Sequence, residues 1–451
     1  MSEKKTIDSR LELAPSGPLA GPIELNAFQL LMRDWTKLGP YNAAQALCVA
    51  GLPDSSRWET SIHEVISALG LGRPRVEGSR AFFDPVQPIP VPVITDASLE
   101  ALAGQQMNLP FADGDFPIRF FIITAVDRHW LLAVYNHWIA DSFAMRSVIR
   151  NMFHRYCDPG ARLAPLTLVT PSFTSLFGRY LGRFPLLTRI RMSSANSLRH
   201  LQAYRLNMVN PLDFHSVVSL RQLPEGLVES LRHQARILRC TMHDLFLTAL
   251  AWACGRLTAA DRYRPRRRHS RTKIALGTIV DIRHCASHPL TDVFGLYLSC
   301  CTMLVDKPET RQLQELARSI GSHSRWIKQS NQAVRRFGTL KTAHIWYHLL
   351  GDPLHQAGFF QKASPTIAGI SNVNLTGDWM DQNQPISTVG PKVLDYIRIS
   401  PTGPLLPMVF TLTTIGRRLS LSVTYRTTAL KPEALDTVIS DFIAALMELA
   451  R

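Results

Sequence analysis

The most informative local feature of the sequence is the segment Tyr135–Ser142, which reads YNHWIADS. His137 directly follows an apolar run that predicts a strand, and Asp141 directly precedes a periodic run that predicts a helix. Imidazole suits the removal of a proton from a bound nucleophile because its pKa lies near neutrality. The spacing alone leaves an alternative open, in which His137 merely ends a strand and Asp141 merely caps a helix.

Alternating strand and helix signals surround this segment in the first half of the chain. Two apolar runs, 118–125 and 130–135, flank the polar turn 126–129 and predict a hairpin. Apolar residues then recur at helical spacing after Asp141. We also expect helices at 24–35 and 58–69 and a strand at 43–49.

The second half repeats this alternation after a proline-rich, basic stretch at 159–200. The run 241–257 is apolar on nearly all sides, which predicts a buried helix. The other expected helices are 224–238, 311–330, 338–350 and 432–449. The expected strands are 273–282, 294–305, 366–373 and 409–425. The uncharged run 399–416 contains three prolines, so we expect a loop followed by a strand there and no membrane span.

The segment Asn136–Ser142 resembles the HHxxxDG motif of the chloramphenicol acetyltransferase-like superfamily. This superfamily includes the condensation domains of nonribosomal peptide synthetases, wax ester and polyketide-associated acyltransferases, and the plant BAHD enzymes. Further similar segments follow in the family's order over nearly the whole chain: Asn26–Leu31, Tyr41-Asn42, Cys240–Leu257, Thr278–Arg283, Phe294–Val305 and Gly369–Gly377. The plant DFGWG motif is absent, because 292–297 reads DVFGLY, and this favours the condensation-like branch.

The resemblance implies an α/β fold with two chloramphenicol acetyltransferase-like lobes, each a mixed sheet flanked by helices. It also implies an active-site tunnel between the lobes. The proline-rich, basic stretch at 159–200 is typical of a crossover between two lobes, so we expect an N-terminal lobe at 1–180, a crossover linker at 181–205 and a C-terminal lobe at 206–451.

The resemblance also implies roles for particular residues. His137 matches the second motif histidine, the general base or positioning group for an acceptor that attacks a thioester. Asp141 matches the motif aspartate, which supports the loop through an arginine, and Arg283 is the candidate partner. A bidentate pair of this kind would fix the loop.

Two motif positions differ from the family pattern, since Asn136 replaces the first histidine and Ser142 replaces the final glycine. A serine there would narrow the acceptor channel or offer a hydrogen bond. The candidate substrate or oxyanion contacts are Asn136, Ser142, Ser371 and Asn372, although a structural turn explains 371–372 equally well. The chain has no GxSxG, HExxH or CxxC pattern, so we expect neither an acyl-enzyme nor a metal.

The chain is basic, with 50 Lys and Arg against 35 Asp and Glu in 451 residues. Such a balance attracts nucleic acid, anionic membranes, acidic carrier proteins or phosphorylated cofactors. Much of the excess lies at 179–199 and 262–273, which are either solvated loops or a positive tunnel mouth. No nucleic-acid motif accompanies them, so we expect no nucleic-acid partner, while peripheral membrane contact stays open.

Seven scattered cysteines without a CxxC pair indicate reduced thiols. No apolar stretch follows the basic start, so we expect no secretory signal and a cytoplasmic protein. We expect a monomer without a permanently bound cofactor. The co-substrate would be a phosphopantetheine thioester, on coenzyme A or on an acyl or peptidyl carrier protein supplied in trans.

The leading hypothesis is therefore a standalone condensation-like acyltransferase for a small-molecule alcohol or amine acceptor, in natural-product or lipid biosynthesis. The alternative is a catalytically silent relative that binds a carrier protein or scaffolds a biosynthetic complex. Asn136 and Ser142 motivate this alternative.

Overall fold

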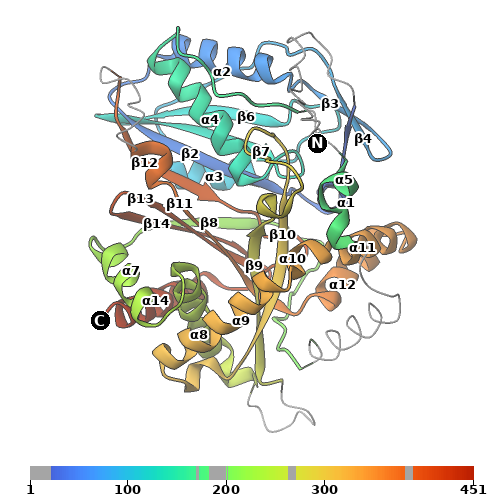
Figure 1. Cartoon of the computed structure of the whole chain (residues 1–451), viewed down its shortest axis with the longest axis vertical. Helices are drawn as coiled ribbons and strands as arrows, with labels where there is room; N and C mark the ends of the chain where they lie inside the picture. Colours follow the sequence, from blue (N-terminus) through green and yellow to red (C-terminus); the bar gives the residue numbers. More distant parts are fainter. Residues whose placement is uncertain (1–21, 169–171, 182–199, 201, 263–270, 381–389) are drawn as a thin grey trace, which may run out of the picture.

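The computed structural model describes residues 22–168, 172–181, 200, 202–262, 271–380 and 390–451. Two mixed β-sheets, each covered by helices, form an upper and a lower lobe in Figure 1. This arrangement confirms the predicted α/β fold with two lobes. The crossover linker falls largely outside the described residues, as does most of the basic stretch at 262–273.

The first sheet has five strands in the spatial order β12-β2-β7-β6-β5. Its members are β12 (Val393–Ile399), β2 (Asn42–Ala50), β7 (Arg128–Asn136), β6 (Ile118–Thr124) and β5 (Val93–Ile94). All neighbours are antiparallel except β5 and β6. The predicted hairpin of 118–135 is present as β6 and β7, with Ile118 opposite Tyr135.

The second sheet has six strands in the order β10-β9-β11-β13-β14-β8. They are β10 (Leu298–Asp306), β9 (Lys273–Asp281), β11 (Thr366–Asn374), β13 (Met408–Ile415), β14 (Arg418–Arg426) and β8 (Ser216–Gln222). The central strand β11 runs parallel to both of its neighbours, and the other pairs are antiparallel. The residues 294–297, which we expected to begin β10, precede the strand instead.

The helices and a small third sheet cover these two sheets. The third sheet consists of β1 (Ile23–Glu24), β4 (Arg80–Phe83) and β3 (Pro74–Glu77). The helices of the first half are α1 (Ala27–Leu38), α2 (Ser55–Leu69), α3 (Leu99–Met107), α4 (Ser142–Cys157) and α5 (Phe173–Leu181). Those of the second half are α7 (Leu227–Ile237), α8 (Met242–Arg262), α9 (Leu313–Gln329), α10 (Gln332–Arg335), α11 (Phe337–Leu349), α12 (Pro353–Ala363), α13 (Thr376–Met380) and α14 (Pro432–Leu449).

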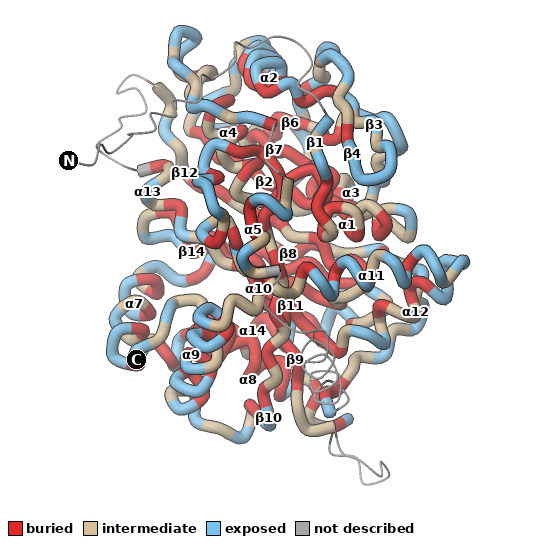
Figure 2. Tube along the Cα trace, turned by 45° about the vertical axis from the view of Figure 1, so that its right-hand side comes forward, coloured by how far each residue is buried: buried red, intermediate tan, exposed pale blue. Residues whose placement is uncertain are grey.

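The strand β2 is buried on both faces, which explains its nearly continuous run of small and apolar residues, NAAQALCVA. Leu47 and Val49 belong to the main core, which includes α2 and α4. Ala44 and Ala46 belong to a second core formed with α3 and with Val218 of β8. Buried residues therefore continue from one sheet to the other, as Figure 2 shows through the middle of the molecule.

One segment departs from the predicted lobe boundaries. β12 lies within the range 206–451, yet it pairs with β2 and completes the first sheet. Its joining the edge of β2 satisfies backbone groups that would otherwise be unpaired at a sheet edge. The range 206–451 therefore contributes to both sheets, and the remaining lobe boundaries stay predictions.

None of the helices in the described residues combines the length and the apolar character needed to cross a bilayer. The proline-containing run 399–416 is a loop followed by β13, as its sequence predicted.

Two glycines allow a test of backbone strain near the first sheet. Gly403 and Gly51 both have left-handed backbone angles, with φ +61° and +85°. A Cβ at Gly403 would overlap the ring of Tyr41, whereas a Cβ at Gly51 would meet nothing within 4 Å. We expect Gly51→Ala to cost about 1–2 kcal/mol of unfolding free energy for the left-handed angle alone. Gly403→Ala should cost about 1–3 kcal/mol more because of the overlap. Denaturant melts of both variants measure the difference between their free energies of unfolding. Equal losses of stability in the two variants would contradict the predicted overlap with Tyr41.

Candidate active site

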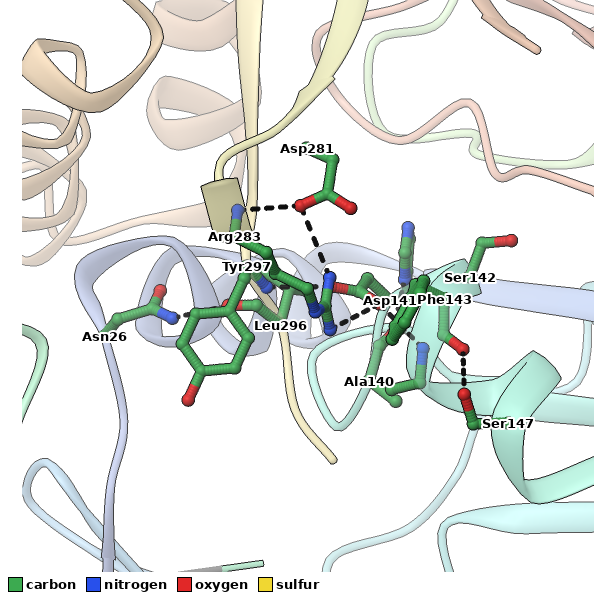
Figure 3. Close-up of polar contacts among 12 residues, drawn as sticks. Asn26, Ala140, Asp141, Ser142, Phe143, Ser147, Asp281, Arg283, Leu296 and Tyr297 are labelled. Carbon is green, nitrogen blue, oxygen red and sulfur yellow. Dashed lines mark hydrogen bonds and ion pairs between the residues drawn. The ribbon is translucent and has the colours of Figure 1, made fainter. Parts of the chain in front are cut away.

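A buried ion pair joins the segment after β7 to the second lobe. Asp141 has no exposed surface, and Arg283 donates to both of its carboxylate oxygens, over 2.7 Å from Nη1 and 3.1 Å from Nη2. Figure 3 shows the guanidinium facing the carboxylate between the two elements. Although burial alone would lower the pKa of Arg283, the Asp141 carboxylate raises it above its ordinary value. The geometry is bidentate, which fixes orientation as well as distance.

The Asp141 carboxylate accepts two further hydrogen bonds from backbone groups. The backbone N–H of Ala144 donates to Oδ1 over 2.9 Å, so Asp141 is the N-cap of α4. The backbone N–H of Tyr297 donates to Oδ2 over 2.8 Å from the loop before β10. Each carboxylate oxygen thereby accepts two hydrogen bonds, so Asp141 has no lone pair left for a ligand.

The first turn of α1 holds the same two loops from the other side. Asn26 caps α1 in a capping box with Gln29. The Asn26 side chain also donates to the carbonyl oxygen of Leu296, and Gln29 donates to that of Trp138. These bonds explain why the sequence opens its first helix with NAFQ.

The side chain of His137 lines the cavity between the lobes. Its Nδ1 lies 3.1 Å from the carbonyl oxygen of Ala140. A carbonyl oxygen only accepts hydrogen bonds, so Nδ1 carries the proton and Nε2 carries the lone pair in the neutral ring. The ring stacks on Tyr41 and meets the edge of Tyr135, at centroid distances of 5.6 and 5.9 Å. The tautomer and orientation of the ring are therefore both set.

The pKa of His137 lies below its ordinary value of 6.5, mainly because burial disfavours the charged ring. The carbonyl of Ala140 and the charge of Asp141 act in the opposite direction but do not prevail. The ring is consequently neutral at pH 7, which leaves Nε2 able to accept a proton.

A cavity of about 440 Å³ opens onto His137 between the two lobes. Its walls come from α1, α4, β2, β7 and β12 on the side of the first sheet and from β9, β10, β11, β13, α11 and α12 on the side of the second. Most of the wall is apolar, including Met32, Leu340, Trp346 and Phe359. The aromatic residues Trp346 and Phe359 line the cavity, while Trp138 and Phe143 do not.

Only two of the four residues expected to contact substrate or the oxyanion line the cavity. Ser142 and Ser371 line the cavity, and Asn136 and Asn372 do not. The amide oxygen of Asn372 contacts Nδ1 of His243, whose Nε2 lies 2.6 Å from the Thr278 hydroxyl. The amide oxygen of Asn136 is buried and has no hydrogen-bond partner among the described residues.

Two residues of the site were missed by sequence reasoning. Gln45 lies within the apolar run of β2, and its amide donates to Tyr135 and to the carbonyl oxygen of Ser142. Arg398 lies on β12, and its Nε donates to the Ser142 hydroxyl over 2.6 Å. For Gln45, a polar residue inside an otherwise apolar strand was the available signal.

One group of side chains in the described residues has the composition of a metal site. Ligand atoms of Asp34, His344 and His348 lie within 4.8 Å of one another on α1 and α11. Asp34 is already hydrogen-bonded to His344 over 2.6 Å and lies 3.7 Å from Lys37. None of the three residues lines the cavity, so the group takes no part in the site at His137.

Neither a known protein family nor a curated protein sequence matches the chain. Solved structures do match over nearly its full length. The first condensation domain of the calcium-dependent antibiotic synthetase, in complex with a substrate analogue, matches with a TM-score of 0.69 and 13% identity, and 96% of each chain is covered.

Two further structures show the range of the similarity. The condensation domain from the Monacolin K polyketide synthase MokA has a TM-score of 0.64 and 13% identity, over 96% of this chain and 98% of that one. Polyketide synthase associated protein 5 from Mycobacterium tuberculosis has a TM-score of 0.62 and 14% identity, over 95% and 100%. The chain therefore has the two-lobe, chloramphenicol acetyltransferase-like fold of condensation domains, which confirms the resemblance at the level of fold.

The Asp141–Arg283 pair predicts a large loss of stability on truncation. Asp141→Ala removes the bidentate partner of the Arg283 guanidinium, whose side chain is 9% exposed, and leaves only the longer contact of 3.6 Å with Asp281. We expect a loss of about 3–5 kcal/mol in the free energy of unfolding, because the charge stays buried after losing its main partner. Ser98 is an exposed N-cap on α3, and Ser98→Ala should cost about 1 kcal/mol. Urea melts test the contrast, and a loss for Asp141→Ala no larger than that for Ser98→Ala would show that the ion pair adds nothing beyond the cap.

Proposed function

We propose that the protein is an acyltransferase that moves an acyl group from a thioester to an alcohol or amine, with His137 as the general base. The observation that supports this proposal most directly is the neutral His137 ring, which lines a mostly apolar cavity and whose Nδ1 is engaged by the Ala140 carbonyl oxygen. The condensation-domain fold agrees with this reaction class. The pathway would be natural-product or lipid biosynthesis.

In the proposed reaction, the acceptor O–H or N–H gives its proton to Nε2 of His137 as its oxygen or nitrogen attacks the thioester carbonyl. The new bond to carbon forms, the carbon–sulfur bond breaks, and the proton on Nε2 passes to the departing thiolate. The products are an ester or amide and a free thiol. The cavity holds both reactants near His137, which replaces a bimolecular encounter by a positioned one.

The Ala140 carbonyl supports this exchange because its contact with Nδ1 persists through it. As Nε2 gains a proton the ring becomes cationic, and the carbonyl then accepts from a stronger donor. Asp141 lies in the same loop and favours the charged ring electrostatically. Asp141 and Arg283 therefore serve as positioning residues for His137.

A basic second cavity supports a donor that carries phosphate. This cavity of about 810 Å³ shares three wall residues with the first, namely Ser364, Thr366 and Leu405. Its wall carries three cationic side chains and one acidic one: Arg205, Arg271, Lys362 and Asp261. Coenzyme A and the phosphopantetheine arm of a carrier protein are both anionic, and a cationic rim attracts either donor.

The central test replaces the proposed base. His137→Ala should lower the rate of acceptor-dependent thiol release by at least about 10²-fold, which is the usual contribution of a general base. The assay follows free thiol from a panel of acyl-coenzyme A and acyl-carrier thioesters with pooled alcohols and amines. His63→Ala, on the exposed face of α2, is the control and should keep the wild-type rate.

The same assay distinguishes the noncatalytic alternative. A wild-type protein that binds an acyl-carrier protein without releasing thiol would support a silent carrier-binding or scaffolding role. Equal rates for wild type and His137→Ala would refute the role of this histidine, provided that thermal melts show both proteins folded.

The lowered pKa of His137 predicts the pH dependence of turnover. Its folded pKa lies below 6.5, so the ring loses its proton at a lower pH than a free histidine would. Activity should therefore decline toward acid pH, as Nε2 becomes protonated, with a midpoint below 6.5. The pH profile of kcat/KM measures this decline. A midpoint above 6.5 on the acid side would contradict the assignment of neutral His137 as the general base.

A further inference from the structure

Arg398 is a buried cation in the wall of the His137 cavity. It lies on β12, and the residue is only 4% exposed. Its Nε donates to the Ser142 hydroxyl over 2.6 Å, and its Nη2 donates to the Ser371 hydroxyl over 2.8 Å. These two hydroxyls belong to different lobes, so the guanidinium is held from both sides and its orientation is set.

Neither contact neutralises its charge. Within the described part of the chain, Arg398 forms no ion pair with a carboxylate, and its Nη1 is buried without a hydrogen-bond partner. The nearby acids are already paired, Asp141 with Arg283 and Asp378 with Arg146 over 2.7 Å. Burial and the like charge of Arg146 lower the pKa of Arg398 to about 10, which still leaves it charged at pH 7.

A buried cation without a counterion is costly, and such groups are normally paired. The guanidinium has five N–H donors, and the two serine hydroxyls use two of them. The unpartnered Nη1 and the remaining N–H of Nη2 form the fork that matches a carboxylate. An anion at this position would supply both the missing hydrogen-bond acceptors and the missing counter-charge of the Arg398 guanidinium.

The composition of the cavity agrees with an anionic ligand. The charged side chains in its wall are Arg336 and Arg398, and no aspartate or glutamate among the described residues lines it. The apolar remainder of the wall suits hydrocarbon, so the ligand would combine an acidic group with an apolar body.

We infer that Arg398 binds a carboxylate of the substrate that reacts at His137. This inference rests on the proposed function and narrows its substrate class to acids. The carboxylate belongs either to the acceptor, as in a hydroxy or amino acid, or to a diacid acyl group esterified at one end. Ser142, where the motif has glycine, then acts as a positioning residue that orients the guanidinium.

A binding experiment tests the site independently of any turnover. Octanoate should raise the melting temperature of the wild-type protein in a dose-dependent way, and octan-1-ol should raise it less. Arg398→Met should remove the difference between the two ligands. Arg336→Met, in the same cavity, and Ser142→Gly should keep most of it, since both retain the Arg398 guanidinium. An octanoate effect that survives in Arg398→Met would overturn the inference.

A kinetic experiment then assigns the carboxylate to one substrate. Acceptors with a free carboxylate are compared with their methyl esters, and diacid monothioesters with matched monoacid thioesters. Arg398→Met should lower kcat/KM about 10- to 100-fold for the carboxylate-bearing member of one pair, as expected for a lost charge-assisted contact, and leave the neutral member nearly unchanged. Arg398→Lys should recover only part of the loss, because it restores the charge without the fork.

The outcomes separate the two proposals. Equal losses for charged and neutral substrates would mean that Arg398 stabilises the tetrahedral oxyanion or only supports the serines, and would refute carboxylate recognition. Absence of thiol release from the wild type, with Arg398-dependent octanoate binding intact, would refute acyl transfer and retain the anion site.

Discussion

The buried carboxylate of Asp141 is the point on which the arrangement of the site depends. It accepts from Arg283, from the N–H of Tyr297 and from the first turn of α4, so a single side chain connects one loop of each lobe to a helix N-terminus. A buried charge tolerates little displacement of its partners, because every lost hydrogen bond exposes the cost of desolvation. The position of His137, four residues earlier, is a consequence of this constraint, since its ring is held by Ala140 next to Asp141.

Much of the fold followed from local patterns. The hairpin of β6 and β7, the buried helix α8 and the closing helix α14 all form where apolar periodicity predicted them. Periodicity reports which face of an element is buried, and these elements are buried in the ordinary way. It carries no information about which strands become neighbours, and for that reason the pairing of β12 with β2 could not be read from the sequence.

The candidate site was likewise predictable only where its residues lie close together in the sequence. His137 and Asp141 were recognisable because they share one short segment at the boundary of a strand and a helix. Arg283 came only from the resemblance, and the contact it makes depends on the approach of the two lobes. Arg398 gave no usable signal, because an arginine in a strand normally faces solvent. Only the crossing of β12 to the first sheet turns this side chain inward, toward Ser142 and Ser371.

This crossing also bears on how the chain folds. Ala44 pairs with Ile399, so the edge of β2 has no strand beside it until most of the polypeptide has emerged from the ribosome. Contacts between such distant parts of a chain form slowly, because loop closure precedes any gain from pairing. An exposed strand edge in the meantime invites pairing with other chains. The first lobe is thus the earliest part to be synthesised and among the last to be completed, and chaperone protection would matter most during that interval.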